Sequence, residues 1–415
     1  MPLLASSKAR VGIVGGGFGG ATLARYLVRQ AGVSVTLIDP VSAFITCPFS
    51  NLVLTGAKTL SEITFSRRGL IRDGVEFIPL GVTGIDAARR ELTLSDGSKD
   101  RFDFLVCAPG VEMNYESVAG ADSAIASHGS GHISQRMPHA WKAGDQTQLL
   151  AAQLGAMRPG GTFLITAPPN PFRCPPGPYE RAGLVAEWMT HHNPAGKVLI
   201  VDQKDSFTKM PLFLEGWRKR YGDRVEWIGL SQTGELREVI DGGKADKSGK
   251  RGIRTDFDEF RADVVNLIPP QRAPSVLRDA GLDEGRGWCP VHPDSFESRV
   301  ASNVFIIGDA ASAAPMPKSA FSANNQAKLV AAVIAARVNG QSAPTAWLVN
   351  TCYSLVASDY GISVSGTYRA RDDMLIQTGG GQSPTGADEQ VHQLEATYTH
   401  GWYESITRDS FGGAA

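Results

Sequence analysis

Residues 10–27, RVGIVGGGFGGATLARYL, decide the fold of this chain. The apolar run RVGIVG at 10–15 predicts a strand, and ATLARYLVRQ at 21–30 has the periodicity of a helix. A second apolar run, VSVTLID at 33–39, predicts another strand. Two strands joined by a helix form a βαβ unit, so we expect a parallel sheet here.

The glycines between the first strand and the helix follow the pattern GxGxxG. Gly15 permits the tight turn, Gly17 lets the backbone approach a pyrophosphate, and Gly20 lets the helix pack on the strand. The pyrophosphate would lie on the helix N-terminus, where unpaired N–H groups favour anions. Asp39 ends the second strand, at the distance at which an acid accepts from a ribose hydroxyl. We therefore predict a dinucleotide site that includes Phe18, and the alternative is a glycine-rich turn without a ligand.

The length, net charge and apolar runs of the chain indicate its number of domains and argue against some classes of protein. The chain has 415 residues, which predicts more than one domain. Its formal net charge of -1 gives no electrostatic reason to expect nucleic acid as a partner. No run reaches the roughly 18 apolar residues that a membrane span needs. The N-terminus MPLLASSKAR is not a secretory signal as it stands, although a shortened sequence would look the same.

A second βαβ pattern lies in the middle of the chain. GTFLITA at 161–167 and KVLIVDQ at 197–203 predict strands, with a helical pattern at 180–189 between them. The loop at 168–178 reads PPNPFRCPPGP where a nicotinamide-binding unit would repeat the glycine fingerprint. Proline has no N–H to offer a phosphate. We therefore expect no nicotinamide here, which argues against an NAD(P)H-dependent disulfide reductase.

A distant motif favours FAD over NAD. NVFIIGD at 303–309 resembles the strand-Gly-Asp motif of two-dinucleotide flavoproteins, whose aspartate binds the ribityl chain, so Gly308 and Asp309 become candidate FAD ligands. FDFLVCAPG at 102–110 resembles their second FAD-domain motif, and Cys107 in it is expected to be a small buried residue. The predicted fold class is α/β: a glutathione-reductase-like FAD domain, an inserted second Rossmann-like domain and a C-terminal α+β domain.

The domain boundaries follow from these patterns. We assign 1–122 and 262–340 to a discontinuous FAD-binding domain, 123–261 to the second Rossmann-like domain, and 341–415 to the C-terminal domain.

Five cysteines are present: Cys47, Cys107, Cys174, Cys289 and Cys352. None lies in CxxC or CxxCH, so we expect no zinc ribbon, no thioredoxin motif and no covalent haem on this chain. The eight histidines form no ligand-spaced cluster, and no metal site is predicted.

Over nearly its whole length the chain resembles the flavoprotein subunit of flavocytochrome c sulfide dehydrogenase. The specific stretches are RCPPGPYERA at 173–182 and TCYSLVASDYGISVSGTY at 351–368. TCP at 46–48, MPHAWKAGDQT at 137–147, MPKSAFSANNQAK at 316–328 and GWYESITRDSFG at 401–412 are similar too.

The resemblance implies roles for single residues. Cys47 matches the cysteine that forms a thioether with the flavin 8α-methyl group, and Asn51 follows it in the same matched stretch. Cys174 and Cys352 match a redox-active disulfide beside the flavin. Lys318 and the helix after it resemble the element at the flavin pyrimidine edge. Trp402 resembles an aromatic residue packed near the flavin, and the alternative is an ordinary packing residue.

The chemistry implied is oxidation of hydrosulfide, which attacks the disulfide and leaves a persulfide and a thiolate. Glu180 is the candidate acid/base, and the alternative is that it only favours a helix N-terminus. The family passes electrons to a c-type cytochrome in the periplasm, so we expect a separate cytochrome partner and that location. Cys289 is left without a role.

Two rival functions remain. A sulfide:quinone reductase is expected to have a basic amphipathic anchor at its C-terminus. Residues 385–415 instead carry five acidic side chains against Arg408 alone. The other rival is a non-catalytic electron-transfer subunit that only retains flavin, and the presence of both Cys174 and Cys352 argues against it.

Overall fold

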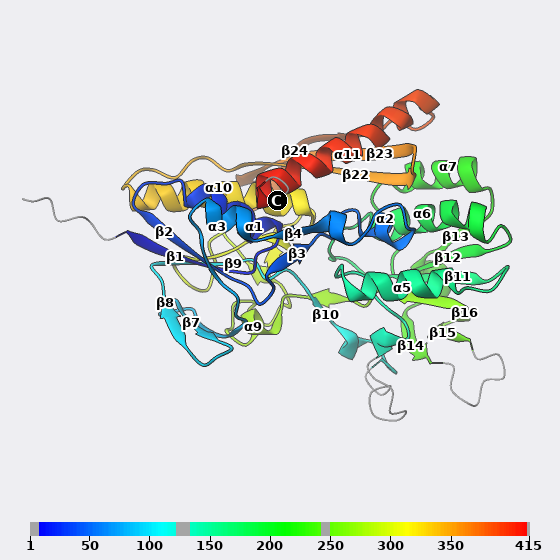
Figure 1. Cartoon of the computed structure of the whole chain (residues 1–415), viewed down its shortest axis with the longest axis horizontal. Coiled ribbons are helices and arrows are strands. Elements are labelled where there is room, and N and C mark those ends of the chain that lie inside the picture. Colours follow the sequence, from blue (N-terminus) through cyan, green and yellow to red (C-terminus); the bar gives the residue numbers. More distant parts are fainter. Residues whose placement is uncertain (1–7, 122–132, 242–249, 413–415) are drawn as a thin grey trace, which may run out of the picture.

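The computed structural model describes residues 8–121, 133–241 and 250–412. The predicted boundary between residues 122 and 123 lies outside these ranges, as do the first seven residues of the N-terminus. Two parallel sheets lie end to end along the long axis, and a C-terminal layer runs over both (Figure 1).

The first sheet has five parallel strands in the order β20-β9-β1-β2-β5. Their inner residues are almost continuously apolar and buried, as expected for strands covered on both faces. Helix α1 contacts α10 on one side of this sheet. The strands are β1 (Ala9–Val14), β2 (Val33–Ile38), β5 (Glu76–Ile78), β9 (Phe104–Cys107) and β20 (Val304–Ile306), and the helices are α1 (Phe18–Leu27) and α10 (Ala320–Val338).

Strand β20 comes about 200 residues after β9, so the first unit is discontinuous, as predicted. The chain between them builds the second sheet, in the order β13-β12-β11-β17. This sheet is also parallel, and consists of β11 (Thr162–Ala167), β12 (Lys197–Asp202), β13 (Val225–Ile228) and β17 (Val264–Leu267). Helices α5 (Asp145–Gly155), α6 (Gly177–His192) and α7 (Met210–Tyr221) accompany it.

One predicted boundary needs correction. The sequence analysis placed residue 262 at the return to the FAD-binding domain, but β17 is the fourth strand of the second sheet. Val264 to Leu267 are all buried and pair in parallel register with Phe163 to Thr166 of β11. The chain returns to the first unit only after this strand.

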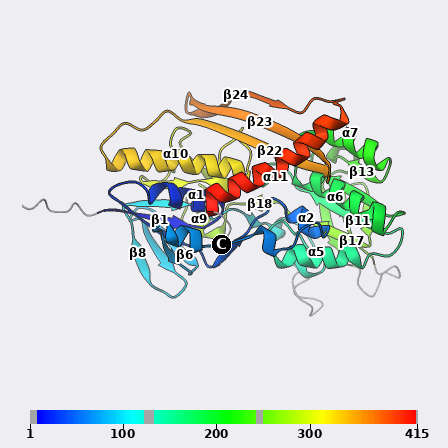
Figure 2. The same cartoon turned by 45° about the horizontal axis from the view of Figure 1, so that its top comes forward.

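The C-terminal segment is an antiparallel sheet with one long helix. Strands β22 (Trp347–Ala357), β23 (Tyr360–Arg371) and β24 (Met374–Gln382) pair in sequence order, and α11 (Glu389–Phe411) packs on β22 and β23. Strand β22 contacts both α10 and α6, so this layer joins the two parallel units (Figure 2). Among the described residues, no helix has both the length and the apolar character needed to cross a membrane.

The remaining elements are short connections. They are β3 (Ala43–Ile45), α2 (Ser50–Leu54), β4 (Thr64–Ser66), α3 (Arg68–Arg72), β6 (Val82–Asp86), β7 (Glu91–Leu94), β8 (Lys99–Arg101), β10 (Glu112–Met113), α8 (Leu230–Thr233), β14 (Leu236–Ile240), β15 (Arg251–Thr255), β16 (Glu259–Ala262), β18 (Gln271–Arg272), α9 (Ser275–Arg278), β19 (Cys289–Pro290) and β21 (Ala311–Ser312).

Candidate active site

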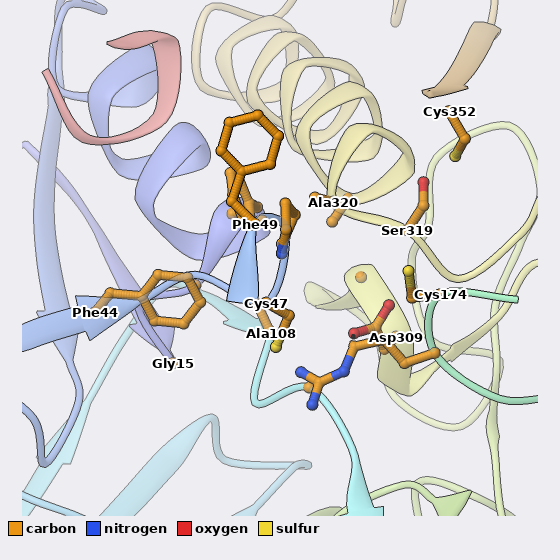
Figure 3. A pocket seen from close by; sticks show the side chains of 18 of the residues that line it. Gly15, Phe44, Cys47, Phe49, Ala108, Cys174, Asp309, Ser319, Ala320 and Cys352 are labelled. Carbon is orange, nitrogen blue, oxygen red and sulfur yellow. Dashed lines mark ion pairs between the residues drawn. The ribbon is translucent and has the colours of Figure 1, made fainter. Parts of the chain in front are cut away.

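One cavity lies where the three parts of the chain meet (Figure 3). It is partly open to solvent, and its lining extends from the glycine turn after β1 to β22 of the C-terminal layer. Most residues singled out in the sequence line it: Gly15, Gly17, Phe18, Asp39, Cys47, Cys174, Glu180, Gly308, Asp309, Cys352 and Trp402.

The glycine-rich turn is packed as the fingerprint requires. Gly15 has a φ of 91°, and a Cβ there would lie 2.5 Å from the carbonyl oxygen of Ala108. A Cβ on Gly20 would overlap the carbonyl oxygen of Gly15. Gly17 is the N-cap of α1 and has no side chain to cover the free N–H groups of the first turn. The turn therefore presents an uncovered helix N-terminus to the cavity, which suits a pyrophosphate.

Asp39 is held at the end of β2 by backbone and side-chain donors. Its Oδ2 accepts from the Gly16 amide at 2.6 Å and lies 3.2 Å from Nη2 of Arg67, while Oδ1 accepts from the Val41 amide at 2.9 Å. Arg67 is 2% exposed and also donates to the Gly16 carbonyl. The sequence analysis missed Arg67, because nothing in its local sequence indicates a contact with the glycine turn.

Asp309 carries the observation that favours a flavin cofactor. Its Oδ1 is buried and has no hydrogen-bond partner among the described residues, and Oδ2 lies 3.9 Å from Nε of Arg173. Burial raises the pKa of this carboxyl, while Arg173 and Lys318 act in the opposite direction. A buried acceptor without a donor is costly unless a ligand supplies one. A ribityl hydroxyl would be such a donor, so the residues present fit FAD.

The N-terminus of α10 also faces the cavity, through Ser319, Ala320 and Ala323. Lys318 does not line it. Its Nζ donates to the carbonyls of Asp309 and Ala311, both at 2.7 Å, and lies 3.7 Å from the ring centre of Trp288. The partial positive charge at this side of the cavity therefore comes from the N-terminus of α10. Lys318 instead links the turn at Asp309 to the start of α10 through its hydrogen bonds.

Three cysteines line the cavity and come from three different parts of the chain. Cys47 follows β3, Cys174 precedes α6, and Cys352 lies on β22. In Figure 3 the sulfur atoms of Cys174 and Cys352 point toward the same region beside Ser319, and Cys47 lies near Ala108. All three are free thiols, so the S–S bond implied for Cys174 and Cys352 is not formed here and stays a prediction.

Arg173 is a second residue that the sequence analysis left without a role. Its guanidinium lies between Asp309 and the carbonyl of Trp141, to which Nη2 donates at 2.7 Å. Burial acts against the charged form of Arg173, while Cys47, Asp309 and Cys174, in that order, raise its pKa. A fixed cation therefore stands next to two of the cavity thiols.

Glu180 faces the same space from the first turn of α6. Its Oε1 accepts from the Leu355 amide at 2.9 Å and its Oε2 accepts from Nδ2 of Asn51 at 2.8 Å. Burial raises the pKa of this carboxyl, and these two hydrogen bonds oppose the shift. A carboxyl with a raised pKa beside thiols is a candidate for proton exchange with them.

Asn51, predicted as a cofactor ligand, is not among the residues that line the cavity. It is buried, and its Oδ1 accepts from Nε of Arg181 at 2.9 Å while Nδ2 holds Glu180. Its contacts are those of a support for Glu180. Gly20 is also outside the cavity, where it packs α1 against the glycine turn.

The other cysteines lie in the first core. Cys107 and Cys289 are both fully buried, and burial raises the pKa of both thiols. Cys289 acquires no role from its position. Within the described ranges, no group of three or more metal-ligating side chains comes together.

Three family models match this chain. "Pyridine nucleotide-disulphide oxidoreductase" matches residues 9–142. "Sulfide dehydrogenase [flavocytochrome c] flavoprotein chain, central" matches 147–269, and "Flavocytochrome c sulphide dehydrogenase, flavin-binding" matches 344–411.

The relatives belong to two kinds of sulfide-oxidising flavoprotein. The mitochondrial sulfide:quinone oxidoreductase of Mus musculus is 25% identical over 320 residues, which cover 74% of this chain and 66% of the mouse protein, just under two thirds. The sulfide dehydrogenase flavoprotein chain of Chlorobaculum thiosulfatiphilum is 60% identical over 45 residues, 11% of this chain and 94% of that sequence.

Solved structures agree on the fold. The sulfide:quinone oxidoreductase of Aquifex aeolicus has a TM-score of 0.71 at 16% identity, and the match covers 98% of this chain and 93% of that one. A ferredoxin reductase of Rhodopseudomonas palustris has a TM-score of 0.63 at 18% identity, covering 86% and 82%.

These matches confirm the predicted fold class: a pyridine nucleotide-disulfide oxidoreductase fold with two Rossmann-like domains. They support an FAD-dependent oxidoreductase related to sulfide-oxidising flavoproteins.

Proposed function

We propose that this chain oxidises hydrosulfide to zero-valent sulfur or polysulfide, using FAD and the pair Cys174 and Cys352, and passes the electrons to a c-type cytochrome. The observation that carries the proposal is that both cysteines and Glu180 line the cavity that also contains the glycine turn and Asp309. Two thiols, a carboxyl and a dinucleotide site in one cavity suit two-electron sulfur chemistry.

The reaction starts from the oxidised pair, with a bond between the two sulfur atoms. Hydrosulfide attacks one sulfur, the bond between the cysteines breaks, and its electron pair stays on the other cysteine as a thiolate. A second hydrosulfide takes the outer sulfur of the persulfide as a disulfane and frees the second thiolate. Bound FAD supplies the acceptor for the two electrons released when the two thiolates rejoin.

The described residues supply the supporting functions. Glu180 takes the proton of an incoming hydrogen sulfide molecule or of a released thiol, since it lines the cavity with both cysteines and burial raises its pKa. The N-terminus of α10 stabilises negative charge at the cavity. Arg173 stands beside Cys47 and the cavity thiols as a fixed cation.

The proposal includes a thioether between Cys47 and the flavin, and a periplasmic location. Cys47 is partly exposed at the cavity wall, and among the described residues its sulfur makes one weak hydrogen bond, to the Trp141 carbonyl at 3.4 Å. Acid precipitation followed by peptide mass spectrometry tests the bond. Flavin retained on the peptide that contains Cys47 is the expected result, whereas flavin released to the supernatant contradicts it.

A second candidate function is sulfide:quinone oxidoreduction. The match to the mouse mitochondrial enzyme over 74% of this chain favours it. The two functions share the sulfide half-reaction and differ in the electron acceptor.

A single experiment separates the candidates. The protein is mixed with sulfide without oxygen, and flavin absorbance near 450 nm is followed before a c-type cytochrome or a short-chain quinone is added. Rapid bleaching and faster reoxidation by the cytochrome are expected. Faster reoxidation by the quinone selects the second function, and no bleaching by sulfide contradicts both and leaves the non-catalytic flavin subunit.

A further inference from the structure

Cys352 lies between two donor groups on one face of β22. Side chains alternate along a strand, so Asn350, Cys352 and Ser354 project from the same face. Asn350 and Ser354 are buried, at 2% and 1% exposure, while Cys352 is partly exposed to the cavity. The surroundings of this sulfur are therefore set by two fixed neighbours.

The orientation of Asn350 is fixed by the start of α10. Its Oδ1 accepts from the hydroxyls of Ser319 at 2.6 Å and Ser322 at 3.1 Å. Ser319 Oγ also accepts from the Ser322 amide at 3.0 Å, and its hydroxyl proton is shared between Asn350 Oδ1 at 2.6 Å and Ser322 Oγ at 3.0 Å. Nδ2 of Asn350 donates to Cys352 Sγ at 3.4 Å, and the Cys352 thiol also donates to Oδ1 of Asn350 at 3.6 Å, a bond that is lost when the thiol loses its proton. An N–H donor aimed at sulfur favours its thiolate form.

Lys209 stands on the other side. It is 3% exposed and precedes α7 with a φ of 63°. Its Nζ donates to Ser354 Oγ at 2.8 Å and to the carbonyls of Cys352 and Ile362 at 3.4 Å. Across the described ranges no carboxylate lies within ion-pair distance of it. A buried cation without a contacting anion is costly, and a negative charge formed on Cys352 would lower that cost.

The charged groups around Lys209 point the same way. Burial lowers the pKa of Lys209 to about 8, and the groups that oppose this shift are, in order, Cys352, Glu180, Cys174 and Glu395. Among these groups, Cys352 therefore has the largest effect on the pKa of Lys209.

Cys174 has different surroundings. No donor reaches its Sγ within hydrogen-bond distance in the part of the chain that the structure describes. Burial raises the pKa of its thiol, and the carboxylate of Glu180 raises it further, while Arg173 opposes with the smallest effect. A negative charge on Cys174 is therefore disfavoured by burial and by Glu180, and no hydrogen-bond donor among the described residues stabilises it.

We propose that Asn350 and Lys209 are positioning residues that make Cys352 the leaving sulfur. The inference rests on the proposed function and deepens it by naming the attacked atom. Hydrosulfide bonds to Sγ of Cys174, the bond between Cys174 and Cys352 breaks, and the electron pair of that bond stays on Cys352, next to the donors. The persulfide is therefore carried by Cys174.

The position of the persulfide tests the assignment directly. The oxidised FAD-loaded protein is mixed with one equivalent of sulfide without oxygen, alkylated with iodoacetamide and digested with trypsin. Cys174 lies in CPPGPYER at 174–181 and Cys352 in the peptide at 338–369, so the two are separated. An extra sulfur on the Cys174 peptide is expected. An extra sulfur on the Cys352 peptide overturns this inference alone, and a persulfide on neither peptide overturns the proposed function with it.

The role of Lys209 is tested without sulfide. The reduced FAD-loaded protein is alkylated at a series of pH values and then digested, and the extent of alkylation of Cys174 and of Cys352 is measured on their separate peptides. Lys209→Met is expected to raise the pH midpoint of Cys352 by about one unit, a roughly tenfold slower alkylation at neutral pH, and to leave Cys174 unchanged. Asn350→Leu is expected to act in the same direction.

The matched control is Lys219→Met, the same change on the exposed side of α7. It is expected to leave both midpoints unchanged. Equal shifts of both cysteines in Lys209→Met, or none, overturn the role of Lys209. Retained flavin absorbance in each variant separates these results from a failure to fold.

Discussion

Gly20 fixes how closely α1 approaches the turn before it, because a Cβ there would overlap the carbonyl oxygen of Gly15. Gly15 has a second constraint, its left-handed φ of 91°. A larger residue at either position would move the turn away from the place where a pyrophosphate contacts the α1 amides.

Gly20→Ala is therefore expected to reduce bound flavin at least tenfold, because the turn and helix must separate to admit the methyl group. The measurement is the flavin-to-protein absorbance ratio of the purified protein. Gly155→Ala at the end of α5 is the control, since nothing lies within 4 Å of a Cβ there. Equal flavin content in Gly20→Ala and wild type would contradict this reading of the cavity.

Lys209 gives a pH-dependent prediction. Burial lowers its pKa from 10.5 to about 8, so at pH 8 to 10.5 the unfolded chain keeps a proton that the folded chain has lost. Stability from this group therefore rises with pH across that window, and below pH 8 the buried charge costs about 3 kcal/mol. Lys209→Met removes that cost but loses hydrogen bonds worth about 1 kcal/mol.

We expect Lys209→Met to be about 2 kcal/mol more stable than wild type at pH 7. The advantage is expected to disappear by about pH 10. Urea unfolding at matched FAD saturation measures the difference. A difference that stays constant between pH 7 and pH 10 would show that the ammonium charge is not what Lys209 contributes.

At the scale of elements, α6 connects the cavity to the second sheet through Arg181. This side chain is 2% exposed and donates to Oδ1 of Asn51 at 2.9 Å, Oδ1 of Asn266 at 2.7 Å and the carbonyl of Ala140 at 2.7 Å. Burial lowers its pKa to about 10. Through Asn51, this network also holds Glu180 in place.

Arg181→Met leaves these buried acceptors without a donor, so the free energy of unfolding is expected to fall by about 3 kcal/mol. Denaturant unfolding measures it, with Arg218→Met on the exposed side of α7 as the control. A loss no larger than that of the control would mean that the network does not stabilise the fold.

The elements with strong local patterns were predictable from the sequence. The glycine-rich turn and the apolar runs on either side of it predicted β1, α1 and β2. The stretch NVFIIGD predicted β20 and a cofactor-binding role for Asp309, which lines the cavity. The boundary at 262 was wrong because DVVNLI predicts a buried strand but carries no information on its partner. The contacts of Asn51 with Glu180 and of Lys318 with the Asp309 carbonyl were not predictable for a related reason, since the direction of a side chain depends on distant donors and acceptors.

At the scale of the whole molecule, the cavity exists only because the C-terminal layer closes it. Cys352 and Trp402 come from this layer, Gly15 and Asp309 from the first unit, and Cys174 from the second. The spacing of these residues in the sequence does not show that such distant segments meet. Their presence in one site was predicted only from the resemblance of whole stretches to a family.

The second unit has the fold of a nucleotide-binding domain but a proline-rich loop after β11. Prolines at 168, 169, 171, 175, 176 and 178 remove amide donors that a phosphate would need. NADH and NADPH are therefore expected to leave the flavin oxidised in anaerobic mixing. Bleaching by either nucleotide at rates similar to those with sulfide would contradict this prediction.

The central claim is that Cys174 and Cys352 carry electrons from sulfide to FAD in one cavity. Its most direct test is anaerobic stopped-flow mixing of sulfide with wild type and with Cys352→Ser, each loaded with flavin. The account predicts rapid bleaching near 450 nm in wild type and a loss of at least a hundredfold in the variant, with flavin content unchanged. Bleaching of Cys352→Ser at the wild-type rate would contradict it.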